Sequence, residues 1–290
     1  MTDIAMTIPD LHAAYARGVS PEQIIAQVYT RLREVDDPCI FLSMASEADA
    51  QAAATALGPY DPAKPLWGVP FAVKDNIDVA GNETTAACPA YAYTPTQDAF
   101  VVAKLREAGA IFIGKTNLDQ FATGLVGVRT PYGAPRNSID PEIVPGGSSG
   151  GSGVAVGHGI VAFSLGTDTA GSGRVPAALN NIVGLKPTLG ALSATGVVPA
   201  CRSVETVSIF ALTVADAYTA FTVACAYDAA DAYARHISAP PLAAPKPAPV
   251  IGIPSRDSIR FSGDAVQEAS FNAAVDLLSG QGAEIREIDF

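Results

Sequence analysis

The sequence predicts an α/β fold, because helical and strand-like stretches alternate along much of its length. Residues 99–108 have a helical pattern and are followed by an apolar strand at residues 110–114, an order typical of α/β sheets. A second apolar run, residues 69–73, ends in a polar Lys-Asp-Asn sequence at residues 74–76. Because α/β proteins place their chemistry at strand ends, this run also indicates where a functional site lies.

Composition and charge restrict the class of protein. The chain has 290 residues, of which 49% are hydrophobic and 16% charged, as in a folded protein with a sizeable core. Its formal net charge of -11 repels phosphate backbones and anionic membranes, so we expect neither nucleic acid nor membrane as a partner. No two of the four cysteines have the spacing of a metal site, and we expect no metal and no cofactor.

The N-terminus and the longest apolar region indicate a soluble, cytoplasmic protein. Residues 1–9 contain no basic cluster ahead of an apolar run, unlike a signal peptide. No stretch reaches the roughly 18 apolar residues that a membrane span requires. The longest apolar region, residues 211–227, is interrupted by Asp216, and we interpret it as a core helix.

Local signals mark the other elements in chain order. Residues 20–23, Ser-Pro-Glu-Gln, combine an N-cap serine, a proline at the first helical position and a capping-box glutamine. The five prolines of residues 238–249 predict an exposed, extended connector. The remaining expected elements are strands at residues 41–44, 160–165, 249–254 and 283–290, a helix at residues 47–57 and an amphipathic helix at residues 264–279.

We expect these elements to form a single domain over residues 1–290. Its expected parts are a helical N-terminal part at residues 1–60, a catalytic core at 65–213, the connector at 238–249 and an incomplete C-terminal part. The last expectation rests on Phe290, which ends the chain inside an apparent strand.

A glycine- and serine-rich segment, residues 145–153, contains Ser148 and Ser149 between apolar neighbours. A flexible linker is one interpretation, although a linker would not be wedged into a core. A phosphate-binding loop would need a lysine after the glycines or a complete dinucleotide pattern, and neither is present. Residues 146–150 match the Gly-x-Ser-x-Gly nucleophile elbow. That chemistry needs a histidine base downstream of the serine, and none of the chain's three histidines fits this role.

A base other than histidine must therefore activate a serine, because a serine hydroxyl alone is a weak nucleophile. Lys74 is the candidate, since burial at the end of an apolar strand disfavours its charged form and lowers its pKa from about 10.4. The alternative is that Lys74 and Asp75 form an ordinary surface feature, although the apolar run before them favours burial.

A second candidate serine, Ser172, lies in residues 166–176 after a series of small residues. Small residues allow consecutive backbone N–H groups to converge in front of an oxygen, as in an oxyanion hole. We expect Asp168 to anchor the turn, and Arg174 to bond an acidic group or a backbone carbonyl. An ordinary turn between a strand and a helix is the alternative.

Three ordered stretches resemble the amidase signature family. They are Val-Lys-Asp-Asn at residues 73–76 and the glycine- and serine-rich residues 146–152 and 166–174. The similarity runs from about Pro65 to Thr213. The resemblance implies the family's fold, a mixed central sheet covered on both faces by helices, and its Ser–cis-Ser–Lys catalytic unit.

The family's roles can be carried over residue by residue. They make Ser172 the nucleophile, Ser148 the bridging serine after a cis peptide bond, and Lys74 the base. Ser149 competes for the bridging role, but the family's spacing to the nucleophile matches Ser148. The resemblance further implies an oxyanion hole from the backbone N–H groups of Thr169, Ala170, Gly171 and Ser172, and substrate binding by Gly124 and Arg174.

Within the family, residues 84–89, 114–127 and 196–203 resemble the allophanate hydrolases. This resemblance implies that allophanate is hydrolysed with release of ammonia in urea degradation. The family's domain is normally longer than this chain, so residues that hold the carboxylate of allophanate can lie beyond Phe290.

Three alternatives remain open. The chain resembles other amidases of the same family and the glutaminase subunit of glutaminyl- or aspartyl-tRNA amidotransferases. A non-catalytic binding protein with a decayed site is a further alternative, although Lys74, Ser148 and Ser172 keep the required chemistry. The expected partner is a small-molecule amide, and the large members of the family leave a homodimer as one option.

Overall fold

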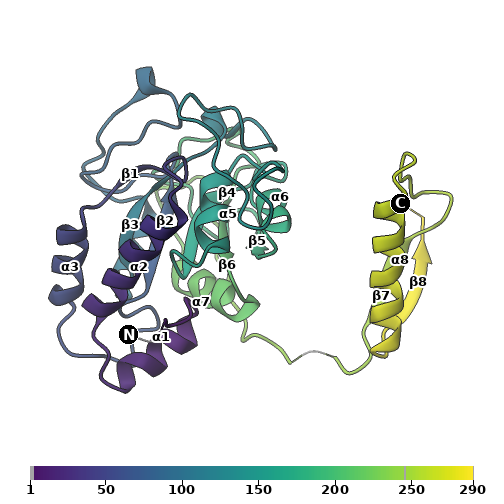
Figure 1. The fold of residues 1–290 in the computed structure, drawn as a ribbon, viewed down its shortest axis with the longest axis horizontal. Coiled ribbons are helices and arrows are strands. Elements are labelled where there is room, and N and C mark those ends of the chain that lie inside the picture. The colour runs from purple at the N-terminus through teal and green to yellow at the C-terminus, as the bar shows by residue number, and fades with distance from the viewer. Residues whose placement is uncertain (1–2, 245, 290) are drawn as a thin grey trace. The chain divides into compact units, whose positions relative to one another are not determined.

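The computed structural model describes residues 3–244 and 246–289. The chain divides into two compact units, Met1–Pro240 and Pro241–Phe290, and each is described by itself (Figure 1). Within the described ranges, no helix is both long and apolar enough to cross a membrane.

A six-stranded sheet forms the centre of the first unit, and it is mixed, as the family resemblance implied. Strand β2 runs parallel to its neighbours β3 and β4, whereas the pairs β1–β3, β4–β6 and β6–β5 are antiparallel. The strands in sheet order are β1 (Phe41–Met44), β3 (Ile111–Thr116), β2 (Pro70–Lys74), β4 (Phe163–Thr167), β6 (Val207–Ala211) and β5 (Val183–Leu185).

Helices cover both faces of this sheet, which completes the predicted α/β fold (Figure 1). Helix α5 packs against β2, β3, β4 and β6, and α7 packs against β4, β5 and β6. The helices are α1 (Ile8–Ala16), α2 (Pro21–Val35), α3 (Glu47–Ala56), α4 (Phe100–Glu107), α5 (Gly150–Gly157), α6 (Arg174–Leu179) and α7 (Val214–Ala224), with short 3₁₀ turns η1 (Pro89–Tyr91) and η2 (Gln120–Ala122).

Helix α2 begins as its sequence predicted. The Ser20 side chain accepts a hydrogen bond from the Gln23 backbone, and the Gln23 side chain accepts one from the Ser20 backbone. This reciprocal capping box satisfies two donors that the first turn of a helix leaves free. The predicted strand at residues 41–44 is also confirmed, and the helix expected at 47–57 ends one residue earlier.

Helix α5 was not predicted. It starts at Gly150 inside the glycine- and serine-rich segment, although glycine disfavours helices by roughly 1 kcal/mol per residue. Packing explains its position, because residues 150–156 are all buried. A Cβ atom at Gly151 would lie 2.6 Å from the backbone nitrogen of Asn117, so glycine allows this helix to approach the end of β3 closely.

The core of the first unit reaches the ends of the parallel strands. All five residues of β2 are buried, and the rings of Phe71 and Phe163 stack across the β2–β4 pair at 5.3 Å. Lys74, the last residue of β2, pairs in register with Thr116 at the end of β3. Because β2, β3 and β4 are parallel, the residues that follow them gather at one edge of the sheet.

The second unit consists of two parallel strands and one helix. They are β7 (Val250–Pro254), α8 (Ala265–Gly280) and β8 (Glu284–Ile288). The expected strand–helix–strand order is therefore confirmed, with boundaries shifted by one or two residues. The Asp264 side chain caps α8, but no residue of this helix is buried in the described structure.

Candidate active site

Three segments that are distant in sequence meet at the carboxyl edge of the parallel strands. Lys74 ends β2, Ser148 lies just before α5, and Ser172 lies between β4 and α6. All three residues are buried, with Ser172 the most exposed at 3%. The residues that the sequence identified are therefore brought to the same region of the fold.

The amine of Lys74 donates hydrogen bonds to two hydroxyl groups. Its Nζ atom donates to Oγ of Ser148 at 2.7 Å and to Oγ1 of Thr167 at 2.8 Å. The alternative of a surface Lys74–Asp75 feature is wrong, because both side chains are buried. Thr167 was missed from the sequence, although its place at the end of β4 could have suggested it.

Burial lowers the pKa of Lys74 from 10.5 to about 7. Loss of water around the ammonium causes this shift. The carboxylates of Glu205, Asp119 and Asp168 act in the opposite direction and limit it. A substantial fraction of the lysine is therefore neutral near pH 7, and a neutral amine can accept a proton.

The peptide bond between Gly147 and Ser148 is cis, as the family resemblance implied. The Gly147 N–H donates to the Leu125 carbonyl at 2.9 Å, and the Ser148 carbonyl accepts from the Asp119 N–H at 2.9 Å. A Cβ atom at position 147 would overlap Oδ2 of Asp119. Glycine is therefore required here by the close approach of Asp119.

The neighbouring Ser149 has a different environment from Ser148. Its hydroxyl donates to the Thr167 carbonyl at 3.2 Å and accepts from the Thr167 N–H at 3.4 Å. Ser149 therefore binds the backbone of β4, whereas Ser148 contacts Lys74. This geometry favours Ser148 for the bridging role.

The hydroxyl of Ser172 faces the loop that follows β3. It donates to the Gly124 carbonyl at 3.4 Å, while the Ser172 carbonyl accepts from the Ser149 N–H at 3.3 Å. Within the described residues, no hydrogen bond joins Ser172 to Ser148. Gly124, expected at the substrate site, thus lies beside the predicted nucleophile.

Asp168 anchors the turn around Ser172, as expected. It accepts from the backbone N–H groups of Gly171 at 2.7 Å and Gly173 at 3.1 Å. The Arg174 guanidinium makes two further bonds to the same carboxylate, at 2.9 and 3.0 Å. Arg174 therefore bonds an acidic group, while its predicted role in substrate binding stays a prediction.

The four backbone N–H groups that are predicted to form the oxyanion hole differ in whether they already have a hydrogen-bond acceptor. The Gly171 N–H is already bonded to Asp168. Among the described residues, the N–H groups of Thr169, Ala170 and Ser172 have no acceptor. These three amides are available to an oxygen in the site, and the hole itself stays a prediction.

A buried ion pair involves Asp75, the residue that follows Lys74 in sequence. The Nζ atom of Lys115 is 3.3 Å from a carboxylate oxygen of Asp75, and both side chains are at most 1% exposed. Lys115 also donates to Thr84 at 2.9 Å, and Asp75 accepts from the Thr85 backbone at 3.0 Å. This network ties the end of β2 to residues 83–85. Burial lowers the pKa of Lys115.

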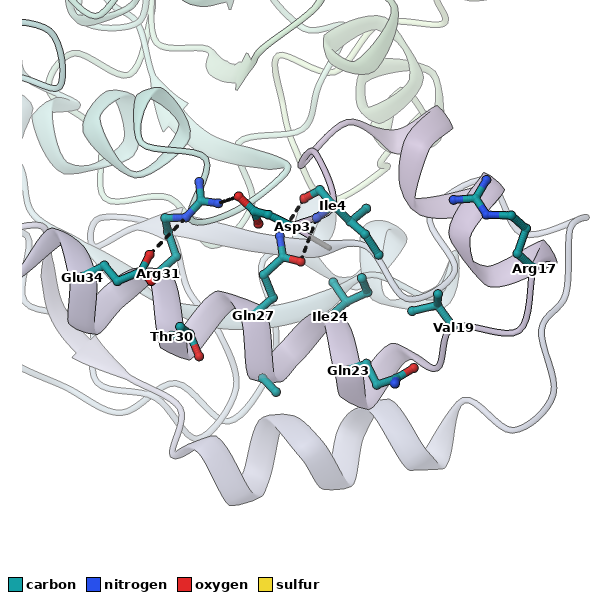
Figure 2. A pocket seen from close by; sticks show the side chains of 11 residues that line it. Asp3, Ile4, Arg17, Val19, Gln23, Ile24, Gln27, Thr30, Arg31 and Glu34 are labelled. Atoms are coloured by element: carbon teal, nitrogen blue, oxygen red, sulfur yellow. Dashed lines mark hydrogen bonds and ion pairs between the residues drawn. The ribbon is translucent and has the colours of Figure 1, made fainter. Parts of the chain in front are cut away.

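A cavity of about 690 Å³ lies elsewhere, along α2 (Figure 2). Its charged side chains are largely paired, since Arg31 bonds Asp3 and lies 3.8 Å from Glu34. None of the predicted catalytic residues lines this cavity. The candidate catalytic residues therefore lie at the strand ends and not in this cavity.

No group of three or more metal-binding side chains gathers within the described part of the chain. The site combines a buried lysine, a serine after a cis peptide bond and a second serine in a strand-to-helix turn. On a mixed α/β sheet, this combination defines the class of amidase signature proteins.

The chain belongs to the amidase family, because the family model described as Amidase matches residues 23–290. It is 55% identical over 227 residues to urea amidolyase of Saccharomyces cerevisiae, covering 78% of this chain and 12% of that protein. It is 37% identical to a subunit of the glutamyl-tRNA(Gln) amidotransferase of Lysinibacillus sphaericus, covering 99% of this chain and 61% of the relative.

A solved structure shows the same fold. Allophanate hydrolase of Kluyveromyces lactis superposes with a TM-score of 0.88 at 44% identity, covering 100% of this chain and 48% of that one. The chain thus spans about half of this structure and about an eighth of the yeast urea amidolyase.

Proposed function

We propose that this chain hydrolyses a small carboxylated amide, allophanate, and releases ammonia in urea degradation. The observation that carries the proposal is the 2.7 Å hydrogen bond between the buried amine of Lys74 and the hydroxyl of Ser148. A lysine whose pKa is lowered to about 7 is suited to accept a proton at neutral pH.

The first step forms an acyl-enzyme. Neutral Lys74 accepts the Ser148 hydroxyl proton while Ser148 accepts the proton of Ser172, and the Ser172 oxygen attacks the amide carbonyl carbon. The Ser172 hydroxyl must turn from the Gly124 carbonyl toward Ser148 for this transfer. In this proposal the N–H groups of Thr169, Ala170 and Ser172 bind the developing oxyanion, and Gly171 joins them once its bond to Asp168 is released.

The second step breaks the carbon–nitrogen bond and regenerates the serine. The proton held by Lys74 returns through Ser148 to the leaving nitrogen, which departs as ammonia. Water then gives a proton to the same relay and attacks the acyl carbon, which releases the carboxylated product and restores Ser172. With allophanate, that product is an N-carboxylated carbamate that loses carbon dioxide.

The choice of allophanate is supported by the relatives. The solved relative from Kluyveromyces lactis is an allophanate hydrolase, and a urea amidolyase is 55% identical to this chain. Arg174 is the candidate for binding a substrate carboxylate from this chain, since its side chain remains 55% exposed while paired with Asp168. Its role can be tested by Arg174→Gln, which we expect to raise KM more than it lowers kcat.

A substrate panel tests the proposed reaction. Ammonia release is measured from allophanate, biuret, malonamide and glutamine, with Ser172→Ala as the matched inactive variant. We expect release from allophanate by the unchanged chain and none by Ser172→Ala. Release from another amide but not from allophanate would overturn the substrate, and release by Ser172→Ala would overturn the assigned nucleophile.

A second candidate is the glutaminase subunit of a tRNA-dependent amidotransferase. The amidotransferase relative from Lysinibacillus sphaericus favours it, because its similarity covers 99% of this chain. Such a glutaminase would release ammonia from glutamine. Glutamine hydrolysis in the panel, with no release from allophanate, would support this candidate.

A further inference from the structure

Asp119 is a buried carboxylate that the proposed reaction does not use. It lies after β3 and just before η2, and its side chain is fully buried. Among the described residues, no lysine, arginine or histidine lies within ion-pair distance of it. A buried carboxylate without a cation is costly, so its contacts need a specific explanation.

The carboxylate of Asp119 holds the loop beside Ser172. Its Oδ2 atom accepts from the Gly127 N–H at 3.0 Å, and its Oδ1 atom accepts from the Arg129 N–H at 2.7 Å. A Cβ atom at Gly124 would overlap Oδ2 of the same carboxylate. Two backbone amides of the loop are therefore hydrogen-bonded to Asp119. The loop also packs closely against Asp119 at Gly124, whose carbonyl accepts the hydrogen bond from the Ser172 hydroxyl.

Asp119 also contacts the segment that contains Ser148. Its N–H donates to the Ser148 carbonyl at 2.9 Å, and its carboxylate lies against Gly147. Asp119 thus touches both residues of the cis peptide bond that carries the bridging serine. One residue connects the bridging serine with the loop that faces the nucleophile.

We infer that Asp119 is a positioning residue that fixes Ser148 and the Gly124–Arg129 loop relative to each other. This inference rests on the proposed function, since it assigns Asp119 a part in the same relay. The inference can be tested, because substitutions can change the shape and the charge of Asp119 separately.

The carboxylate of Asp119 also belongs to the charged surroundings of Lys74. Three carboxylates raise the pKa of Lys74 against the effect of burial, namely those of Glu205, Asp119 and Asp168. Asp168 is paired with Arg174, whose cation offsets it. Asp75, next to Lys74 in sequence, is paired with Lys115. Within the described ranges, Glu205 and Asp119 thus remain without a cation, and Asp119 also contacts the backbone of Ser148.

Two substitutions separate shape from charge. Asp119→Asn keeps the size but removes the charge and one acceptor, so it loses a loop hydrogen bond and a carboxylate near Lys74. Asp119→Glu keeps the charge but is one methylene longer in a closely packed place. A matched control is Asp216→Asn, which neutralises another buried carboxylate, one that accepts from the Ile8 N–H.

The experiment measures the rate at which an alkyl fluorophosphonate labels Ser172, by mass spectrometry, from pH 5 to 9. This reagent phosphonylates activated serine hydroxyls, with fluoride leaving and the hydroxyl proton passing to the base. Labelling requires no knowledge of the natural substrate. A wild-type chain that is labelled at Ser172 but hydrolyses no amide would overturn the proposed function and still test Asp119.

We expect Asp119→Asn to slow labelling at least about tenfold and to move the half-maximal pH downward by about half a pH unit or more. Asp119→Glu should slow labelling with an unmoved half-maximal pH, and Asp216→Asn should change neither quantity. An Asp119→Asn protein labelled within twofold of wild type would overturn the positioning role. Slower labelling of Asp119→Asn with an unmoved half-maximal pH would still support the positioning role, because the loss of rate then comes from the lost loop hydrogen bond.

Discussion

The buried amine of Lys74 should make folding stability depend on pH in a way that a single substitution removes. Lys74→Met keeps an unbranched apolar side chain of similar length but has no titrating group. The folded pKa of Lys74 is about 7, against about 10.4 in an unfolded chain. Between these values the unfolded chain binds the extra proton, so stability rises with pH through this window and is flat below it.

The size of the effect follows from the two pKa values. Between pH 7 and pH 9 the unfolded lysine stays protonated, while the folded lysine goes from half protonated to neutral. Integration over this interval gives the wild type a gain of about 2 kcal/mol relative to Lys74→Met. The pKa of Lys115 is also lowered, but Lys115 is present in both proteins and cancels from the difference.

Urea unfolding at pH 7 and pH 9 measures this difference. Trp67 is the chain's one tryptophan and is buried in the unit that contains Lys74, so its fluorescence reports on the relevant unit. Lys64→Met at an exposed position is the matched control, and its difference from wild type should not change with pH. A Lys74→Met difference that is constant within about 0.5 kcal/mol would contradict a lowered pKa for Lys74.

Three further predictions concern the site. The acid limb of kcat/KM for amide hydrolysis should be half-maximal near pH 7, because only neutral Lys74 accepts a proton; a pH–rate profile with no limb between pH 6 and 8 would contradict this. Lys115→Met should lower the free energy of unfolding by roughly 3–5 kcal/mol, because it leaves Asp75 buried without its cation. The double variant with Asp75→Asn should recover part of that loss, and no recovery in urea titrations would argue against the pair. Gly147→Ala should reduce activity at least about tenfold by pushing against Asp119, whereas full activity would show that the backbone tolerates a Cβ there.

Much of the fold could be predicted because its signals are local. The capping box at Ser20 and the apolar run before Lys74 depend on neighbours in sequence, and both are confirmed. Helix α5 could not be predicted in this way, since its glycines are poor helix formers. Gly151 is required there because the helix packs closely against the backbone of Asn117. Its start is fixed by tertiary contacts that no local pattern records.

The site was predicted unevenly for the same reason. Lys74 and Ser148 could be identified from motifs, and a 2.7 Å hydrogen bond joins their side chains in the structure. Thr167 and Asp119 were missed, because their importance depends on which distant segments they touch. Asp119 sits in a stretch used only for family resemblance, and its contact with Gly147 requires the assembled sheet.

The dispersal of the site along the chain has a consequence for folding. Lys74 and Thr167 come together only when β2 and β4, more than 80 residues apart in sequence, pair as parallel strands. Such non-local pairing is slow to form, because the entropy of closing a long loop is lost before any contact between the strands stabilises the chain. The proposed nucleophile, Ser172, should therefore gain its reactivity late in folding, and partly folded chains should carry it as an ordinary, unreactive hydroxyl.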